Sequence, residues 1–297
     1  MPEGPEVERV RQDLLPLIDK KIESCYFTKL ALKYARYFDQ ELKLSILKGS
    51  KLSAIDRKGK YLIWKTSGKI DHYILNHLGM TGSWVLFNDR KALKNYLGRE
   101  IKNYCKVVFE FTDGSSGVFD DMRNFGRFHL FETLENLTKK YTAVKNIGLD
   151  GFKFDLDEFK ELLNMKRNVT KPLGVLLLDQ RFIAGIGNIY KSESLWRANI
   201  SPFVTPEELT AAQIKILAES IQSVLYDAYK DGGSTIRNFK SNRAEGKAQD
   251  WHAVYSKEGK ACLRCNNTIK KIVQVQRSTF YCDHCQKKTK YRRNKKK

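Results

Sequence analysis

Residues 262–265 read Cys-Leu-Arg-Cys and residues 282–285 read Cys-Asp-His-Cys, so two Cys-x-x-Cys pairs hold four of the chain's six cysteines. Two thiolates three positions apart on a tight turn can bind one face of a tetrahedral Zn²⁺, and a second such pair completes a shell of four sulfurs. The sequence therefore predicts one structural zinc ion, whose ligands are Cys262, Cys265, Cys282 and Cys285.

The residues between the two cysteine pairs have the pattern of a β-hairpin. Residues 272–276 and 278–281 alternate apolar with polar side chains and are rich in β-branched and aromatic types, as two short strands would be. Arg277 lies near the point where these strands join. A zinc-bound hairpin is therefore the first interpretation of this segment.

A disulfide framework and a redox-active cysteine pair are the two alternatives, and both fit less well. Disulfide frameworks belong to secreted chains, yet residues 1–4 carry no charged-then-apolar signal sequence. Cys25 and Cys105 lie far from the cluster and follow no pairing pattern. A redox pair lies between a strand and a helix and does not require a second copy.

Composition favours a nucleic-acid-binding protein of two domains. The chain has 297 residues, of which 41% are hydrophobic, enough for ordinary cores. No apolar run approaches the length of a membrane span, so we expect a soluble, intracellular monomer with no membrane partner. The net charge is 54 − 34 = +20, which favours a polyanion because each neutralised phosphate releases counterions. Nucleic acid is the expected partner, in the cytoplasm and nucleoid or in the nucleus.

Part of this charge lies in residues 287–297, which carry eight positive charges and no negative one. Such a run cannot form a core and is expected to contact phosphates without reading bases. A solubilising or localisation tail is the alternative, and the sequence does not decide between them.

The first half of the chain has the pattern of a helix followed by short strands. Residues 5–20 place apolar side chains at spacings of three and four, with Pro5 suited to a first helical turn. Strand-like stretches follow, with turn residues between them, and indicate a sheet sandwich or barrel. The expected strands are 51–55, 61–65, 72–76, 83–87, 107–111, 116–119 and 127–131.

The second half is helical in pattern, so the chain is expected to be an α+β protein. The expected helices are 156–164, 168–178, 188–198 and 206–230. The expected division is a β domain at 2–135, a linker at 136–157, a helical domain at 158–253, and a zinc finger with a basic tail at 254–297. The polar segment 240–253 is either a flexible loop over a ligand or plain linker.

Three loops invite a chemical interpretation. Gly185 and Gly187 precede the helix expected to begin near Asn188, where backbone N–H groups could bind a phosphate; a tight turn between helices is the alternative. Loops 77–82 and 121–126 carry long or aromatic side chains beside glycines. Such side chains can wedge into a base stack, although the pattern alone favours core packing. The three candidate wedges are Met80, Arg123 and Phe125.

Seven short blocks occur in a characteristic order over nearly the whole chain. They are MPEGPEV at 1–7, RKGKYL at 57–62, HLGMTG at 77–82, DMRNFG at 121–126, GIGNIY at 185–190, GGST at 232–235 and the zinc finger. This order resembles the formamidopyrimidine-DNA glycosylases and endonuclease VIII. The resemblance implies an N-terminal β-sandwich with flanking helices, a helical helix-two-turn-helix domain and a C-terminal zinc-finger hairpin.

The resemblance also implies a base-excision repair glycosylase with abasic-site lyase activity. Met1 is expected to be removed, which leaves the secondary amine of Pro2 as a nucleophile that forms a Schiff base with the sugar. Glu3 matches the general acid/base and Lys60 a residue for phosphate contact and proton transfer. Glu6 is expected to position the amine. The expected substrates are formamidopyrimidine, 8-oxoguanine or oxidised pyrimidines, followed by strand cleavage through elimination.

Six further residues match DNA contacts of the family. His77, Asn188 and Arg277 would bind the phosphates that flank the lesion. Met80, Arg123 and Phe125 would fill the gap left by the extruded nucleotide.

Several positions depart from the family's commonest patterns and leave lesion preference open. Gly4 matches endonuclease VIII-like members, whereas residues 276–282 are closer to the formamidopyrimidine side. Met122 stands where a proline is usual, and Asn124 where a second arginine is usual. A non-catalytic zinc-finger protein that binds damaged or non-specific DNA is the alternative, although binding alone requires neither Pro2 nor Glu3.

Overall fold

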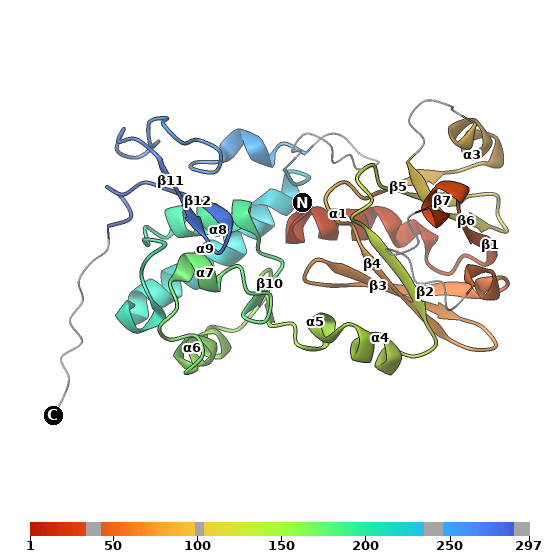
Figure 1. Cartoon of the computed structure of the whole chain (residues 1–297), viewed down its shortest axis with the longest axis horizontal. Coiled ribbons are helices and arrows are strands. Elements are labelled where there is room, and N and C mark those ends of the chain that lie inside the picture. Colours follow the sequence, from red (N-terminus) through yellow and green to blue (C-terminus); the bar gives the residue numbers. More distant parts are fainter. Residues whose placement is uncertain (34–42, 99–103, 235–245, 288–297) are drawn as a thin grey trace. The chain divides into compact units, whose positions relative to one another are not determined.

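The computed structural model describes residues 1–33, 43–98, 104–234 and 246–287. The chain divides into two compact units, one made of Met1–Lys145 with Gly232–Gly246 and the other of Asn146–Asp231 with Lys247–Lys297 (Figure 1). Most of the basic tail and the first residues of the 240–253 loop lie outside the described residues. No helix in the described ranges is both long and apolar enough to span a bilayer.

The first unit contains two four-stranded antiparallel sheets (Figure 1). One sheet has the order β1-β6-β7-β5 and the other β2-β3-β4-β8. The strands are β1 Ile22–Phe27, β2 Lys51–Lys58, β3 Tyr61–Ser67, β4 His72–His77, β5 Ser83–Phe87, β6 Cys105–Phe111, β7 Ser116–Asp120 and β8 Arg127–Phe131. All seven predicted strands are confirmed, whereas β1 was not predicted.

The two sheets share no strand, and aromatic side chains from both form one core between them, so the unit is a sandwich rather than a barrel. Trp64 of β3 and Trp84 of β5 have ring centroids 4.8 Å apart, and Phe109 and Phe128 pack against both. The indole N–H of Trp84 donates to Oδ1 of buried Asn76 at 2.9 Å, so its burial leaves no unpaired donor there. Each ring contributes roughly 1.5–3 kcal/mol through burial.

Helix α1, Gly4–Leu14, packs on this sandwich against β2, β3 and β5. Val7, Val10 and Leu14 form its buried face. The prediction of a helix over 5–20 is wrong at its end, because Pro16 lacks an N–H donor and the chain continues as a 3₁₀ turn, Leu15–Leu17. The unit's other helical segments are α2 Lys29–Leu32, η3 Leu44–Leu47, α3 Arg90–Leu97, α4 Leu134–Lys140 and α5 Thr142–Lys145.

The second unit is helical, with a C-terminal β-hairpin. Buried residues of α6, α8 and α9 form its main core. Its elements are β9 Leu149–Asp150, α6 Leu156–Asn164, α7 Leu173–Leu176, β10 Ile183–Ala184, α8 Asn188–Arg197, η4 Pro206–Glu208, α9 Ala211–Lys230, η5 Ala248–Trp251, β11 Lys270–Gln274 and β12 Arg277–Tyr281. The structure is thus the predicted α+β arrangement of a sandwich, a helical domain and a terminal hairpin.

Two predicted helices of this unit are shorter than expected. Over 168–178 only α7 forms, because Pro172 precedes it and Leu173 N–H donates to the carbonyl of Val204 instead of a helical carbonyl. The helix predicted over 206–230 breaks at Leu209, and α9 starts anew after its N-cap Thr210.

The predicted linker, 136–157, contains most of α4, all of α5 and the strand β9. Residues Gly232–Gly246 group with the first unit, whereas the sequence placed them in the helical domain. The boundaries of the four predicted domains stay predictions.

Candidate functional site

The amino terminus is held in place by two glutamates at the start of α1. Glu3 is the N-cap residue, and its backbone N–H donates to Oε2 of Glu6 at 2.8 Å. The other oxygen of Glu6 accepts a 2.7 Å hydrogen bond from the backbone N–H of Ser234. Gly233 has φ +81°, and a Cβ there would lie 2.8 Å from Oε1 of Glu6, so glycine permits this approach. Both carboxylates are buried.

The terminal amine lies among charged groups from three parts of the first unit. The Met1 side chain is exposed while Pro2 is buried. Burial lowers the pKa of the Met1 amino group, the carboxylates of Glu3 and Glu6 raise it, and the charges of Lys60 and Arg123 lower it further; the net pKa is below the ordinary value. A larger neutral fraction makes an amine at this position a better nucleophile.

Lys60, whose charge acts on this amine, lies in a turn, and His77 is the last residue of β4. Lys60 is buried in the β2–β3 turn, where Gly59 takes φ 59°. Its neighbour Tyr61 pairs with His77 across β3 and β4, and their rings are 5.0 Å apart. His77 Nδ1 accepts a hydrogen bond from Gly79 N–H at 3.1 Å, so the proton of the neutral ring is assigned to Nε2, where it can be donated to a phosphate.

The environment of His77 predicts a specific loss of stability in acid. Burial, then Lys60 and Arg127, lower its pKa from 6.5 to about 4. Above pH 6.5 the ring is neutral in both states, whereas between 6.5 and 4 only the unfolded chain gains the proton. His77 alone should therefore lower the free energy of unfolding by about 2 kcal/mol between pH 7 and 5; buried His252, whose pKa is also lowered to about 4, adds a fall that His77→Gln keeps. Urea unfolding of the parent and His77→Gln measures this, and equal pH slopes would contradict it.

Loops 77–82 and 121–126 are fastened together by one buried carboxylate. Asp121 Oδ1 accepts from the hydroxyl of Thr81 at 2.5 Å, and Oδ2 accepts from Gly126 N–H at 2.7 Å. Arg123 N–H donates to the same Thr81 oxygen at 3.0 Å. A Cβ at Gly79 would lie 2.4 Å from the backbone of Phe125, so the loops touch where glycine leaves room.

This arrangement exposes all three predicted wedge residues. Met80 and Phe125 are 38% and 45% exposed, and the guanidinium of Arg123 lies 5.1 Å from the centroid of the Phe125 ring. The core-packing interpretation of these side chains is therefore wrong. No sequence pattern gave a role to Thr81 or Asp121; the available signal was an acidic residue two positions after the strand predicted over 116–119 and before a glycine-bearing turn.

The second unit presents Asn188 and Arg277. Gly187 is the N-cap of α8 and Asn188 its first residue, and the preceding turn is held by Gln180, which accepts from Gly185 N–H and donates to the carbonyl of Ile186. Asn188 Oδ1 is buried and has no hydrogen-bond partner within the described ranges. Arg277 is the exposed first residue of β12.

The four cysteines of the hairpin fit one tetrahedral zinc ion. Their sulfurs all lie within 4.8 Å of one another, with Cys262–Cys285 at 3.9 Å and Cys265–Cys282 at 3.5 Å. Zn–S bonds of about 2.3 Å in a tetrahedron place sulfurs about 3.8 Å apart. These separations exclude disulfides between these pairs. The N–H of Cys285 and the amide of Asn267 donate to ligand sulfurs, which supports thiolate charge.

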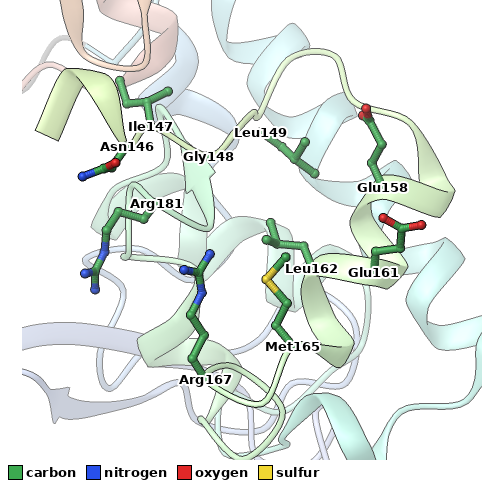
Figure 2. A pocket seen from close by; sticks show the side chains of 10 residues that line it. All are labelled: Asn146, Ile147, Gly148, Leu149, Glu158, Glu161, Leu162, Met165, Arg167 and Arg181. Carbon is green, nitrogen blue, oxygen red and sulfur yellow. The ribbon is translucent and has the colours of Figure 1, made fainter. Parts of the chain in front are cut away.

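A hollow of about 700 Å³ lies elsewhere in the second unit (Figure 2). Arg167 and Arg181 lie on one side of it, and Glu158 and Glu161 on the other (Figure 2). Arg181 is already bound to Asp179 through two hydrogen bonds. None of its lining residues is a predicted site residue.

Three stretches of the chain match known families. Residues 1–128 match the formamidopyrimidine-DNA glycosylase N-terminal domain, residues 147–240 its H2TH domain, and residues 259–288 a zinc finger found in FPG and IleRS. The chain is 35% identical over 294 residues to the formamidopyrimidine-DNA glycosylase of Streptococcus pneumoniae, covering 97% of this chain and 100% of the relative. The chain belongs to the formamidopyrimidine-DNA glycosylase family. The predicted resemblance is thereby confirmed.

Other members of the formamidopyrimidine-DNA glycosylase family match as fully. The enzyme of Lactobacillus delbrueckii subsp. bulgaricus is 36% identical over 296 residues, with 97% and 100% of the two chains covered. The Lactococcus lactis enzyme in a complex with N7-benzyl-Fapy-dG DNA has a TM-score of 0.80 and 33% identity, covering 97% and 100%. Its complex with abasic-site DNA has a TM-score of 0.78 and 32% identity, covering 96% and 100%.

The zinc-finger match and the sulfur geometry agree. Residues 259–288 include all four cysteines, which confirms the prediction of one structural zinc ion. The roles of the other predicted site residues are untested by these comparisons.

Proposed function

We propose that this chain is a DNA glycosylase and abasic-site lyase that acts through the secondary amine of Pro2. The observation that carries the proposal is the place of the amino end, where buried Pro2, Glu3 and Glu6 lie together and the terminal amine is under the charges of Glu3, Glu6, Lys60 and Arg123. Removal of exposed Met1 would leave Pro2 as the terminal residue within these surroundings. DNA binding alone requires no such amine.

The amine supplies the covalent chemistry. Its lone pair attacks C1′ of the extruded nucleotide, the bond from C1′ to the base breaks, and the base leaves with that electron pair. The nitrogen loses its proton, the sugar ring opens and an iminium forms. Removal of a C2′ proton then expels the 3′ phosphate, which cuts the strand, and water hydrolyses the remaining iminium to restore the amine.

Glu3 and Glu6 have distinct proposed roles because their bonding differs. Both oxygens of Glu6 accept backbone hydrogen bonds, from Glu3 and Ser234, which suits a group that fixes the helix start and the amine. Glu3 is the proposed general acid/base, which protonates the sugar oxygen as the ring opens. Lys60, whose charge acts on the terminal amine, is the proposed phosphate contact and proton-transfer residue.

DNA contacts divide into positioning and gap-filling groups. His77, Asn188 and Arg277 are proposed to donate to phosphates, which set register without reading bases. Met80, Arg123 and Phe125 are proposed to occupy the space of the extruded nucleotide, because their loops are pinned by Asp121 while their side chains are exposed.

Double-stranded DNA that carries an oxidised base or an abasic site is the proposed substrate. Solved relatives are complexes with Fapy-dG DNA, abasic-site DNA and DNA that contains carbocyclic 8-oxo-G. We propose formamidopyrimidine and 8-oxoguanine as the first substrates to test, with oxidised pyrimidines as the second class.

Borohydride trapping tests the proposed function. Incubation with lesion duplex and the reductant should convert the iminium to a stable amine and leave a covalent protein–DNA adduct. A matched undamaged duplex should give none. If formamidopyrimidine, 8-oxoguanine, thymine glycol and abasic duplexes all fail to form an adduct, the chain is a DNA-binding protein without this chemistry.

The gap-filling role of Arg123 makes a prediction that depends on the substrate. Arg123→Ala should slow excision from duplex DNA at least about tenfold, because unstacking a base costs a few kcal/mol. Cleavage of a single-stranded abasic oligonucleotide should fall much less, since no base is extruded and only the small effect of the Arg123 charge on the pKa of the terminal amine is lost. Met122→Ala, at the neighbouring exposed position, is the control. Equal loss on both substrates would contradict the role.

A further inference from the structure

We propose that Lys191, a fully buried residue of α8, is a positioning residue that sets Arg277 for its phosphate contact. This inference rests on the proposed function, because it assumes that Arg277 binds a backbone phosphate. Lys191 itself is 0% exposed and cannot reach DNA. Its effect on binding must therefore pass through the hairpin.

The ammonium of Lys191 is bonded to the strand that begins with Arg277. Its Nζ donates to Thr279 Oγ1 at 2.6 Å and to the carbonyl oxygen of Ser278 at 3.3 Å. Both acceptors belong to β12 and follow Arg277 directly in the chain. A buried ammonium is costly unless its donors are bonded, so these contacts fix the strand against α8.

The hydrogen bonds continue from Thr279 to the other strand of the hairpin. Thr279 Oγ1, which accepts from Lys191, donates its own proton to Gln274 Oε1 at 2.8 Å. The amide of Gln274 donates to the carbonyl of Pro202 at 3.2 Å. Gln274 is also the residue that pairs with Arg277 in the β11–β12 register. One continuous network therefore holds both flanks of the hairpin turn.

The turn itself needs such support. Val275 and Gln276 have φ values of 48° and 56°, which is the left-handed region that a β-branched residue strongly disfavours. Arg277 comes directly after this pair and, within the described part of the chain, its guanidinium makes no hydrogen bond or ion pair. The backbone that the Lys191 network holds therefore fixes the point from which this side chain starts.

The adjacent residue, Ser192, connects the same strand to the other proposed phosphate contact of this unit. Its hydroxyl donates to the carbonyl of Asn188 at 2.9 Å and accepts from Phe280 N–H at 3.3 Å. Lys191 and Ser192 thus hold β12 at a fixed position relative to the start of α8. The phosphate contacts of Asn188 and Arg277 become parts of one rigid surface.

The dependence of DNA affinity on salt separates positioning from general stabilisation. Each phosphate contact contributes about 0.9 to the slope of log affinity against log salt. Thr279→Val removes the hydroxyl without changing any charge, and Thr279→Ser keeps it. We expect Thr279→Val and Lys191→Met each to lower the slope by about 0.9 and affinity roughly tenfold, while Thr279→Ser keeps both.

The experiment uses the full-length zinc-bound protein and an abasic-site duplex, with zinc content measured for every variant. Arg277→Ala should lower the slope equally, and Thr279→Val should have no further effect in that background. An unchanged slope in Arg277→Ala overturns the phosphate contact and, with it, this inference. A reduced slope in Arg277→Ala but not in Thr279→Val overturns the positioning role alone, as does an additive loss in the double variant. Thr279→Val provides the answer even if Lys191→Met fails to fold.

Discussion

Protein that keeps one residue before Pro2 is expected to lose the trapped adduct, with glycosylase and lyase rates at least about 100-fold lower. An extra residue turns the Pro2 nitrogen into an amide, which has no available lone pair, and moves the free amine along the chain. A displacement of only 1 Å from the reacting geometry can cost about 10² in rate. We therefore expect the loss of activity even though the extended protein still has a free amine.

Two forms of the same chain make the comparison. One is cut from a fusion so that it begins at Pro2, and the other so that a single glycine precedes Pro2. The extra residue occupies the place of Met1, whose side chain is exposed, so α1 and the Glu6 contacts should be kept. Binding to lesion duplex should differ by less than about threefold, a factor smaller than one lost hydrogen bond would give. Mass spectrometry should verify that the extra glycine is present. If this glycine-extended form is trapped as efficiently as the form that begins at Pro2, the Pro2 mechanism is wrong.

Loss of the zinc site is the second large effect. Cys282→Ser should abolish stoichiometric zinc and unfold the hairpin, because zinc binding supplies about 10–16 kcal/mol in small zinc domains, as much as a whole domain's stability. Arg277 would lose its support, so affinity for abasic-site duplex should fall and its salt slope should decrease.

Cys25→Ala is the matched control for the zinc experiment. Cys25 is also a buried, unbridged cysteine, but it lies in the sandwich unit and is not among the four clustered sulfurs. It should keep one zinc per chain and full DNA affinity. Metal analysis that finds no zinc in the parent protein, or one zinc in Cys282→Ser, would contradict the prediction.

Local pattern predicted most elements, because strand alternation and cysteine spacing are local properties. Local pattern failed where contacts between residues far apart in the sequence determine the structure. Strand β1 was missed since its sequence, Ile-Glu-Ser-Cys-Tyr-Phe, alternates only weakly, and pairing with β6 stabilises it. Leu173 begins a short α7 because Val204 supplies a hydrogen-bond acceptor from a distant loop.

The candidate site was predictable only in part for the same reason. The cysteine ligands follow from spacing alone, whereas the proposed catalytic residues came from resemblance. Sequence patterns gave no sign that Asp121 joins two loops or that Lys191 is buried, since a lysine on a helix is ordinarily solvated. The Glu6–Ser234 bond joins residues 228 positions apart, beyond the reach of any periodic pattern.

That bond has a consequence for biosynthesis. Glu6 leaves the ribosome early, but its Oε1 partner is made only when 228 further residues have been added. Until then one oxygen of the carboxylate that orders the amino end lacks its native donor. A nascent or prematurely terminated polypeptide that lacks Ser234 therefore cannot complete this arrangement, so the amino end gains its full set of native hydrogen bonds only late in synthesis.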